Sequence, residues 1–179
     1  MSGTTAVLPR GSTIRLTLTA LLMGMTIVLS MSVLSIPVPG GHLYFNDTVI
    51  NIAAILLDPV SAFVVGGIGA FLGDFFFYPA PVFVSLVTHG LQAVIVSLLS
   101  HRLFPRHQAL ASSVAVAAGA VVMVIGYTIG RAYVYSTPEY AMLKLPFQIL
   151  QAGFGAVMSI VLLYPLRLRA AYRHILHTR

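Results

Sequence analysis

Apolar stretches, separated by short polar or proline-containing breaks, run along nearly the whole chain. A membrane hydrocarbon core about 30 Å thick takes about 20 helical residues to cross. The pattern therefore predicts an all-α integral membrane protein whose six transmembrane helices form one bundle and one domain over residues 1–179. We expect the spans at about 13–36, 43–57, 59–77, 80–100, 109–134 and 140–166.

The second and third stretches are the shortest, which raises the question of whether they form a single helix. Fused, they would be about 35 residues and about 52 Å long, which exceeds one span. The break between them is Asp58-Pro59. Proline lacks an N–H and disfavours helical geometry at the residue before it, so two separate spans are expected.

The composition excludes several classes of protein. Of the 179 residues, 58% are hydrophobic and 8% are charged, whereas soluble domains carry about 25% charged residues. So few charges cannot cover a water-facing surface, which excludes a soluble enzyme, a disordered chain and a nucleic-acid binder despite the net charge of +6. The chain has no cysteine, and hence no disulfide, thiolate metal site or cysteine nucleophile.

The basic residues predict the orientation in the membrane. Six spans place eight of the ten basic residues on one side: Arg10, Arg15, Arg102, Arg106, Arg167, Arg169, Arg173 and Arg179. Because cytoplasmic loops are enriched in arginine and lysine, both termini are expected in the cytoplasm. A five-span arrangement would place most of these arginines outside. A cleaved signal peptide at residues 1–32 is disfavoured, since its apolar run is long enough to span.

Polar residues within the spans gather at one level. On this topology the following lie in the outer half or near the midplane: Asp47, Asp74, His89, Gln92, Tyr127, Arg131, Lys144, Gln148 and Gln151. Polar groups inside a membrane are costly. Polar residues with only structural roles would be expected in both halves of the membrane rather than in one. The pattern predicts a solute pocket that opens to the outside.

The charged members of this set also have structural interpretations, which stay open. Asp47 either contacts a solute or only caps the second helix at its N-terminus. Asp74 is expected to form a structural ion pair with Arg131 or Lys144. These two cations are alternatively expected to extend to the membrane surface, with their aliphatic stems in the lipid.

The uncharged members have alternatives of the same kind. His89 is either a solute contact or a core histidine hydrogen-bonded to a neighbouring span. Gln148 and Gln151 share a helical face, which suits recognition of a planar polar ring or a helix–helix hydrogen bond. Tyr127 either stacks on such a ring or belongs to the aromatic belt at the membrane surface.

The loop at residues 37–45 follows the first span and lies over the predicted pocket. Pro37 and Pro39 stiffen its start, and Gly40 and Gly41 supply a hinge. It is interpreted as a lid, with an ordinary extracellular turn as the alternative.

Small residues at four-residue spacing mark close helix packing in lipid. The third span carries Ala62, Gly66 and Ala70 on one face, and the first span carries Ala20 and Gly24 near its cytoplasmic end. Such residues pack either within the bundle or against a partner protein.

Motifs for enzymatic chemistry are missing from the sequence. It contains no phosphate-binding loop for ATP, no His-Glu-x-x-His metal site and no Gly-x-Ser-x-Gly nucleophile motif. Ser85 and His89 lie one helical turn apart and mimic a serine–histidine pair. An intramembrane hydrolase is therefore a minor alternative, because no oxyanion-binding element accompanies the pair.

Several segments, in this order and spacing, resemble the substrate-binding S components of energy-coupling factor (ECF) vitamin transporters. They are residues 36–50, 57–60, 66–74, 85–92, 126–127 and 145–152. The resemblance is greatest to the group for hydroxymethylpyrimidine, pyridoxine and related vitamins. The sequence departs from that group at His89 (lysine expected), Gln92 (an acid), Gln148 (asparagine) and Asn46 (glycine). Pantothenate, folate or riboflavin are alternative ligands, and a non-transporting membrane assembly subunit is the alternative function.

The resemblance implies partners and a mechanism. It implies docking on a transmembrane T component with two cytoplasmic ATPases, through Ala20 and Gly24 of this chain. ATP would be used by those partners, and this chain would hold no cofactor or metal. The loaded protein would rotate in the membrane of a bacterial cell to release its vitamin inward. Tyr44 and Asn46 join the expected solute contacts.

Overall fold

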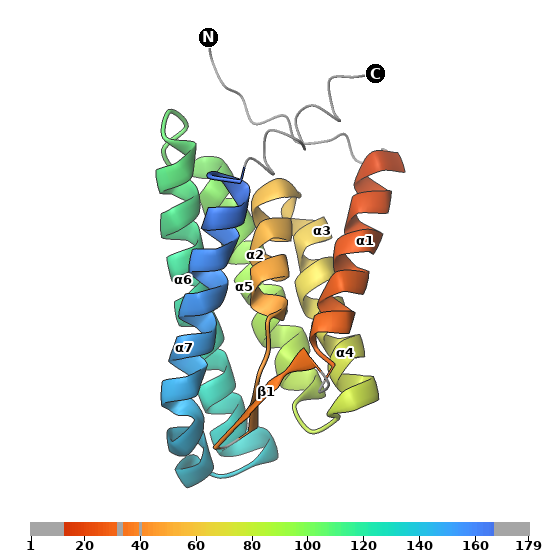
Figure 1. The fold of residues 1–179 in the computed structure, drawn as a ribbon, viewed down its shortest axis with the longest axis vertical. Helices are drawn as coiled ribbons and strands as arrows, with labels where there is room; N and C mark the ends of the chain where they lie inside the picture. Colours follow the sequence, from red (N-terminus) through yellow and green to blue (C-terminus); the bar gives the residue numbers. More distant parts are fainter. Residues whose placement is uncertain (1–12, 32–33, 40, 167–179) are drawn as a thin grey trace.

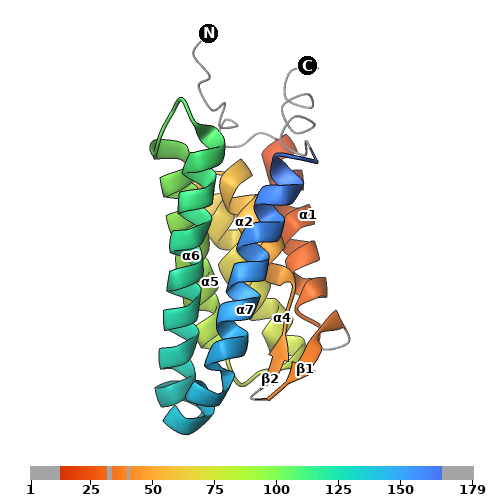
Figure 2. The ribbon, with the colours of Figure 1, turned by 60° about the vertical axis from the view of Figure 1, so that its left-hand side comes forward.

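The computed structural model describes residues 13–31, 34–39 and 41–166. Helices stand side by side in one elongated bundle, with a two-stranded hairpin near one end (Figures 1 and 2). The elements are α1 (Thr13–Leu29), β1 (Ile36–Val38), β2 (Gly41–Leu43), α2 (Asn46–Leu56), α3 (Pro59–Phe63), η2 (Val64–Ile68), α4 (Gly69–Phe77), α5 (Val82–Arg102), α6 (Gln108–Gly130), η3 (Arg131–Tyr135) and α7 (Pro138–Leu163). The wide π-helical turns η2 and η3 continue their neighbours, giving single helices at Pro59–Phe77 and Gln108–Tyr135.

Among the described residues, four helices are long and apolar enough to cross a membrane: Pro59–Phe77, Val82–Arg102, Gln108–Tyr135 and Pro138–Leu163. Helices α1 and α2 are shorter, with 17 and 11 residues. At 1.5 Å per residue, α2 is about 16 Å long, about half of a hydrocarbon core. The chain is thus an all-α membrane protein, and the count of six spans and the cytoplasmic termini stay predictions.

Two predicted boundaries are wrong, and the hairpin explains both. The first helix ends at Leu29 rather than near residue 36, because Ile36 pairs with Leu43 in the hairpin. The second helix begins at Asn46 rather than near residue 43 for the same reason. The expected lid is therefore partly β-structure, and Gly41 holds its turn with φ of 138°, a conformation that favours glycine. Gly40 lies outside the described residues.

The bundle is apolar outside and partly polar inside. Large apolar side chains face outward on the long helices, including Phe83 (69% exposed) and Met142 (62%). Lipid is as apolar as these side chains, so such a surface suits a membrane protein. The buried residues instead include carboxylates, amides and a lysine, which a membrane protein tolerates only when each is paired.

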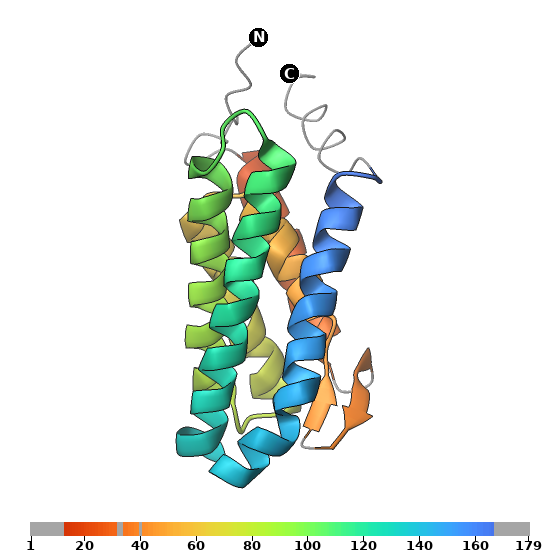
Figure 3. The same cartoon turned by 90° about the vertical axis from the view of Figure 1, so that its left-hand side faces the viewer.

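The described ends of the bundle differ. Helix α1 begins, α5 ends and α7 ends at one end, whereas the hairpin lies toward the other (Figures 1 and 3). Arg15, Arg102 and Arg106 belong to the first end. The five other arginines of the predicted cytoplasmic set, Arg10, Arg167, Arg169, Arg173 and Arg179, lie outside the described residues.

Glycines allow the helices to approach closely. A Cβ on Gly66 would lie 2.8 Å from the His89 carbonyl oxygen, and one on Gly155 would lie 2.5 Å from the Asp47 Cβ. The small residues of the third span therefore pack within the bundle. Gly24 differs, because a Cβ there would meet no atom within 4 Å.

The predicted break at Asp58-Pro59 is present, and Asp58 caps the new helix. Its carboxylate accepts a hydrogen bond from the Ser61 hydroxyl at 2.7 Å and pairs with Arg15 at 3.2 Å. Burial alone would raise the pKa of Asp58, but the hydrogen bonds from Ser61 and the charge of Arg15 outweigh it and lower the pKa below its usual value. The ion pair ties the start of α1 to the start of α3.

This pairing predicts a pH dependence. The unfolded pKa is about 3.9, so the ionised Asp58 stabilises the fold above about pH 4, and that stabilisation is lost as the pH falls through the lower folded pKa. Between about pH 6 and about pH 3, thermal unfolding in detergent should lose less stability in Asp58→Asn than in the wild type. Equal losses in both proteins would show that folding does not lower the pKa of Asp58.

Candidate solute-binding site

A cavity of about 40 Å³ lies at the hairpin end of the bundle. It is lined by His42, Tyr44, Asn46, Asp74, Tyr78, Pro81, His89, Tyr127, Arg131, Lys144, Gln148 and Gln151. These residues come from the hairpin and the residues just after it, from α2, from the loop between α4 and α5, and from the four long helices, whereas α1 contributes none. The volume holds no more than a few water molecules, and a vitamin-sized ring fits only if part of the lining moves.

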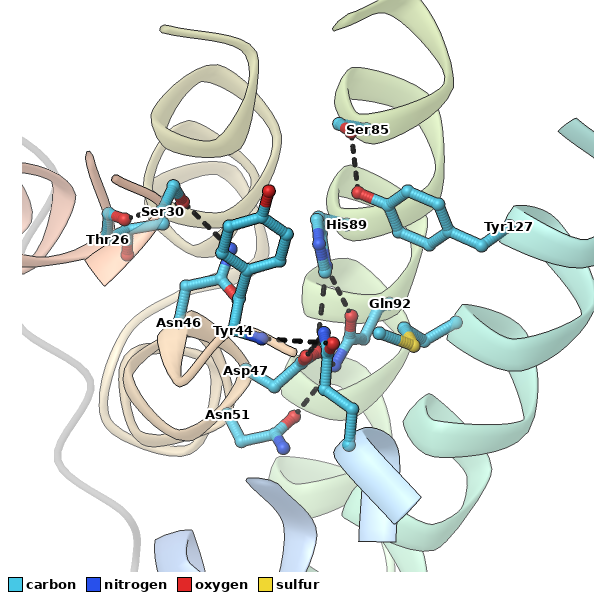
Figure 4. Close-up of polar contacts among 12 residues, drawn as sticks. Thr26, Ser30, Tyr44, Asn46, Asp47, Asn51, Ser85, His89, Gln92 and Tyr127 are labelled. Carbon is cyan, nitrogen blue, oxygen red and sulfur yellow. Dashed lines mark hydrogen bonds and ion pairs between the residues drawn. The ribbon is translucent and has the colours of Figure 1, made fainter. Parts of the chain in front are cut away.

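The Asp47 carboxylate organises the base of this cavity (Figure 4). Asp47 is 1% exposed and accepts hydrogen bonds from the side-chain amides of Gln92 (3.1 Å) and Gln151 (2.8 Å). The Gln92 amide also donates to Asn51 at 3.3 Å, and its oxygen lies 2.8 Å from the His89 Nδ1. A buried carboxylate needs such donors to offset its lost hydration. One charge thereby fixes side chains from α2, α5 and α7.

A second network surrounds Asp74. The Ser85 hydroxyl donates a hydrogen bond to the Asp74 carboxylate and lies 2.5 Å from the Tyr127 hydroxyl. The Tyr127 ring meets the His89 ring edge to face, with centroids 5.2 Å apart. The two networks therefore meet at an aromatic pair that lines the cavity.

Two cations, Arg131 and Lys144, also line the cavity. Lys144 is 1% exposed and donates to the His42 carbonyl oxygen at 2.6 Å. Arg131 is 8% exposed, begins the wide turn η3, and lies 5.6 Å from the centre of the Tyr135 ring. Widened turns of this kind are frequent at functional sites because they redirect a side chain. Here the turn brings a guanidinium into the bundle.

Two hydrogen bonds from α7 hold the hairpin over the cavity. One is the contact of Lys144 with His42, and the other joins the Tyr44 amide to the Gln151 side-chain oxygen at 3.1 Å. The His42 ring also lies 2.9 Å from the Ser35 hydroxyl. Burial raises the pKa of the Tyr44 phenol, and the Asp74 charge adds to this, so the phenol stays neutral. These hydrogen bonds join α7 to the hairpin and to the residue just after it, beside the cavity.

Comparison with known proteins identifies the family. The sequence model of the family described as "ECF-type riboflavin transporter, S component" matches residues 10–168, which is most of the chain. The chain belongs to this family of S components. It is also 34% identical over 136 residues to a Pyrococcus woesei protein described as "Uncharacterized protein in gap 3'region", covering 75% of this chain and 89% of that protein.

An S component is a substrate-binding subunit of a vitamin transporter, and this chain is accordingly a membrane transport subunit rather than an enzyme. The hydrolase alternative also fails on geometry. Ser85 bonds Asp74 and Tyr127, and His89 bonds Gln92, so the two residues do not form a serine–histidine pair.

The cavity of this S component contains most of the residues expected from the sequence. Tyr44, Asn46, His89, Tyr127, Arg131, Gln148 and Gln151 line it, whereas Asp47 and Gln92 lie behind it and hold lining residues. Contact of these residues with a vitamin stays a prediction. The sequence did not indicate His42, Tyr78 and Pro81 as lining residues or Asn51 as a network member. Ser85 was expected only as a partner of His89, one helical turn away, and its bonds to Asp74 and Tyr127 were not foreseen.

Several structural alternatives for single residues are wrong. No cap is formed by Asp47, since α2 has no side-chain cap at its start. Asp74 bonds Ser85 and forms no ion pair with Arg131 or Lys144 within the described part of the chain. Both cations are buried rather than extended to the surface. Tyr127 is also buried, which excludes a place in the aromatic belt.

The two glutamines of α7 have separate roles in the S component. Gln151 joins the hairpin to Asp47, whereas Gln148 donates to the Met123 sulfur at 2.9 Å. Sulfur is a weak acceptor, so a ligand oxygen would compete well for the Gln148 amide. The His89 Nδ1 lies 2.8 Å from the Gln92 oxygen of its own helix and 3.7 Å from the Asp47 carboxylate of the neighbouring helix α2, which leaves its other ring nitrogen for the cavity.

A second hollow lies on the outer face of α1. It has a volume of about 500 Å³ and an apolar lining of Ala20, Leu21, Gly24, Met25, Val28 and Leu29. Ala20 is exposed, and Gly24 has open space at its Cβ position. The small residues of α1 therefore shape a surface groove rather than an internal contact.

Proposed function

We propose that this S component captures a small, water-soluble heteroaromatic vitamin or precursor of the hydroxymethylpyrimidine or pyridoxine type from outside the cell. The observation that carries the proposal is the buried polar cavity at the hairpin end of an apolar bundle. A purely structural role would not need two carboxylate networks and two further cations around one cavity.

The lining suits a planar nitrogen-containing ring. The edge-to-face pair of His89 and Tyr127 offers aromatic surface, and Gln148 offers an amide bound only to sulfur in its present contact. Amides and aromatic rings together recognise the faces and edges of heteroaromatic ligands. The small volume implies that the ligand enters when the hairpin moves, which gives the loop at residues 37–45 the role of a lid.

Riboflavin is the second candidate, because the matched family is described as a riboflavin transporter S component. Its three fused rings and its chain need much more room than one pyrimidine or pyridine ring. Binding of riboflavin would therefore require a larger movement of the hairpin and of the outer ends of the helices.

Delivery of the vitamin requires partners. We place the docking site of a transmembrane T component, which carries two cytoplasmic ATPases, in the α1 groove around Ala20 and Gly24. The cavity lies at one end of the bundle, so release on the other side needs a large movement. Rotation of the whole S component on the ATP-driven partners supplies it, in the plasma membrane of a bacterial cell. The chain itself uses no cofactor or metal in this scheme.

Native mass spectrometry of gently purified protein tests the proposal. A single small molecule with the mass of a heteroaromatic vitamin should remain bound, and unlabelled vitamin should exchange with it in the absence of ATP. Retention of lipid alone, even after incubation with hydroxymethylpyrimidine, pyridoxine and riboflavin, would contradict the proposal.

A further inference from the structure

Three polar side chains in the cavity, those of Asn46, His89 and Tyr127, are each held by a hydrogen-bond chain that begins at an oxygen able only to accept. Such chains fix which atoms donate at every step. They therefore determine what each side chain presents to a ligand, which the residue types alone do not.

The first chain begins at the Thr26 carbonyl oxygen. It accepts the Ser30 hydroxyl at 2.8 Å, and the Ser30 oxygen then accepts the Asn46 side-chain amide at 2.9 Å. Since the only proton of Ser30 is used, Asn46 must donate its NH₂ there. The Asn46 side-chain oxygen is left, buried and without a hydrogen-bond partner within the described ranges. An orphaned buried acceptor is costly unless a ligand satisfies it.

The second chain begins at the Asp47 carboxylate. A carboxylate accepts, so the Gln92 amide presents its NH₂ to Asp47 and its oxygen to the His89 Nδ1 (Figure 4). That oxygen also only accepts, so Nδ1 carries a proton. A neutral imidazole then has a bare Nε2, and His89 presents an acceptor. The same Nδ1 lies 3.7 Å from the Asp47 Oδ1, which also only accepts, so both neighbours of Nδ1 require the proton on that nitrogen.

The third chain begins at the Asp74 carboxylate, which accepts the Ser85 hydroxyl proton. The Ser85 oxygen is 2.5 Å from the Tyr127 hydroxyl and has no proton left to give, so Tyr127 donates. The free lone pair of the Tyr127 oxygen is then an acceptor for a ligand.

Lys144 and Arg131, which also line the cavity, are hydrogen-bond donors rather than acceptors. Lys144 uses one of its three protons on the His42 carbonyl oxygen, and Arg131 carries five N–H donors. Neither cation forms an ion pair with a carboxylate in the described portion of the chain. The cavity is thus divided into an acceptor part and a donor part.

We infer that this division selects the ligand: the pocket binds amino- or hydroxyl-substituted pyrimidines and pyridines that direct two or more O–H or N–H donors to Asn46, His89 and Tyr127. A ligand oxygen or ring nitrogen then accepts from Arg131 or Lys144. An imide edge, with one N–H between two carbonyls, can meet Arg131 and Lys144 but offers the acceptor part only a single donor, so such a ligand binds more weakly. The inference rests on the proposed function and narrows its ligand class.

Matched ligand pairs test this selection. Binding of pyridoxine is compared with that of its hydroxyl-methylated ethers, and binding of hydroxymethylpyrimidine with that of an analogue carrying methyl in place of the amino group. Loss of a donor should weaken binding about tenfold or more, because a buried acceptor loses its partner. Lumichrome, which carries an imide edge, should bind more weakly than either parent.

The variant Tyr127→Phe removes one acceptor. A ligand donor that faces Tyr127 in the wild type then has no acceptor there. For the analogue that lacks this donor, the ratio of the parent's affinity to the analogue's affinity should be about fivefold smaller in Tyr127→Phe than in the wild type. Tyr164→Phe is the matched control, since the Tyr164 hydroxyl bonds Ser112 and the Gln108 carbonyl outside the cavity lining. Its ratio should stay at the wild-type value.

The outcomes separate the two claims. If a parent vitamin binds but its donor-deleted analogues bind equally well, or if lumichrome binds best, the donor–acceptor division is overturned and vitamin capture stands. If no parent, analogue or flavin binds a protein that is folded and monodisperse, the proposed function itself is overturned.

Discussion

Replacing Asp47 with asparagine should weaken vitamin binding by about 5- to 150-fold, the equivalent of about 1–3 kcal/mol for a buried polar group without its partner. Asparagine has the shape of aspartate but offers only one acceptor. One of the Gln92 and Gln151 amides would then face another NH₂ group. Turning Gln92 over would relieve that contact but place its NH₂ against the His89 Nδ1 proton. Replacing Asp47, which lies outside the cavity lining, therefore disturbs the hydrogen bonding of His89, which lies in the lining.

The control is Asp58→Asn, which removes a carboxylate that pairs with Arg15 and Ser61 and does not line the cavity. Its dissociation constant for the bound vitamin should match that of the wild type. Size-exclusion chromatography in detergent checks that both variants remain folded. Equal affinities of Asp47→Asn and wild type would show that the Asp47 network does not position the site.

Substitution of Gly24 by leucine should reduce vitamin uptake about tenfold or more, while binding by the isolated protein changes less than about twofold. A Cβ at Gly24 meets nothing within 4 Å, so the larger side chain disturbs no internal packing. It would instead fill the apolar groove on α1 and clash with a partner seated there. Uptake is measured in liposomes that also contain the T component and the ATPases.

Gly153→Leu is the matched control, because Gly153 also has no atom within 4 Å of its Cβ position and lies on α7, outside the groove. Uptake by this variant should equal that of the wild type. If Gly24→Leu transports at the wild-type rate, the groove is not the docking site. If it loses binding as well as uptake, Gly24 instead supports the fold of the bundle.

The sequence predicted the long helices well because each is a long apolar run between strong breaks. Residues 59–77 were placed with the observed bounds, since Asp58 and Pro59 cap and start that helix. The hairpin was missed because Ile36 and Leu43 are as apolar as the helical residues beside them. Hydropathy cannot distinguish a short strand from the end of a span.

The site was predictable as a set of residues at one depth, but not as a geometry. The predicted direction of each span gave the depth of its polar residues in the membrane. His89, Arg131 and Lys144 were therefore expected at a common level. Which side chains face the cavity depends on helix rotation and on the π-helical turns, which the sequence does not reveal. Asp47 was accordingly expected in the lining and lies behind it.

Titration of the purified protein with a panel of B vitamins in buffer without ATP tests the central claim most directly. Isothermal titration calorimetry should show one saturable site with a submicromolar dissociation constant for a single vitamin class, with amino- or hydroxyl-substituted pyrimidines and pyridines foremost. Heats that never saturate for any vitamin, from protein that is folded and monodisperse, would contradict the account of this chain as the vitamin-capturing subunit.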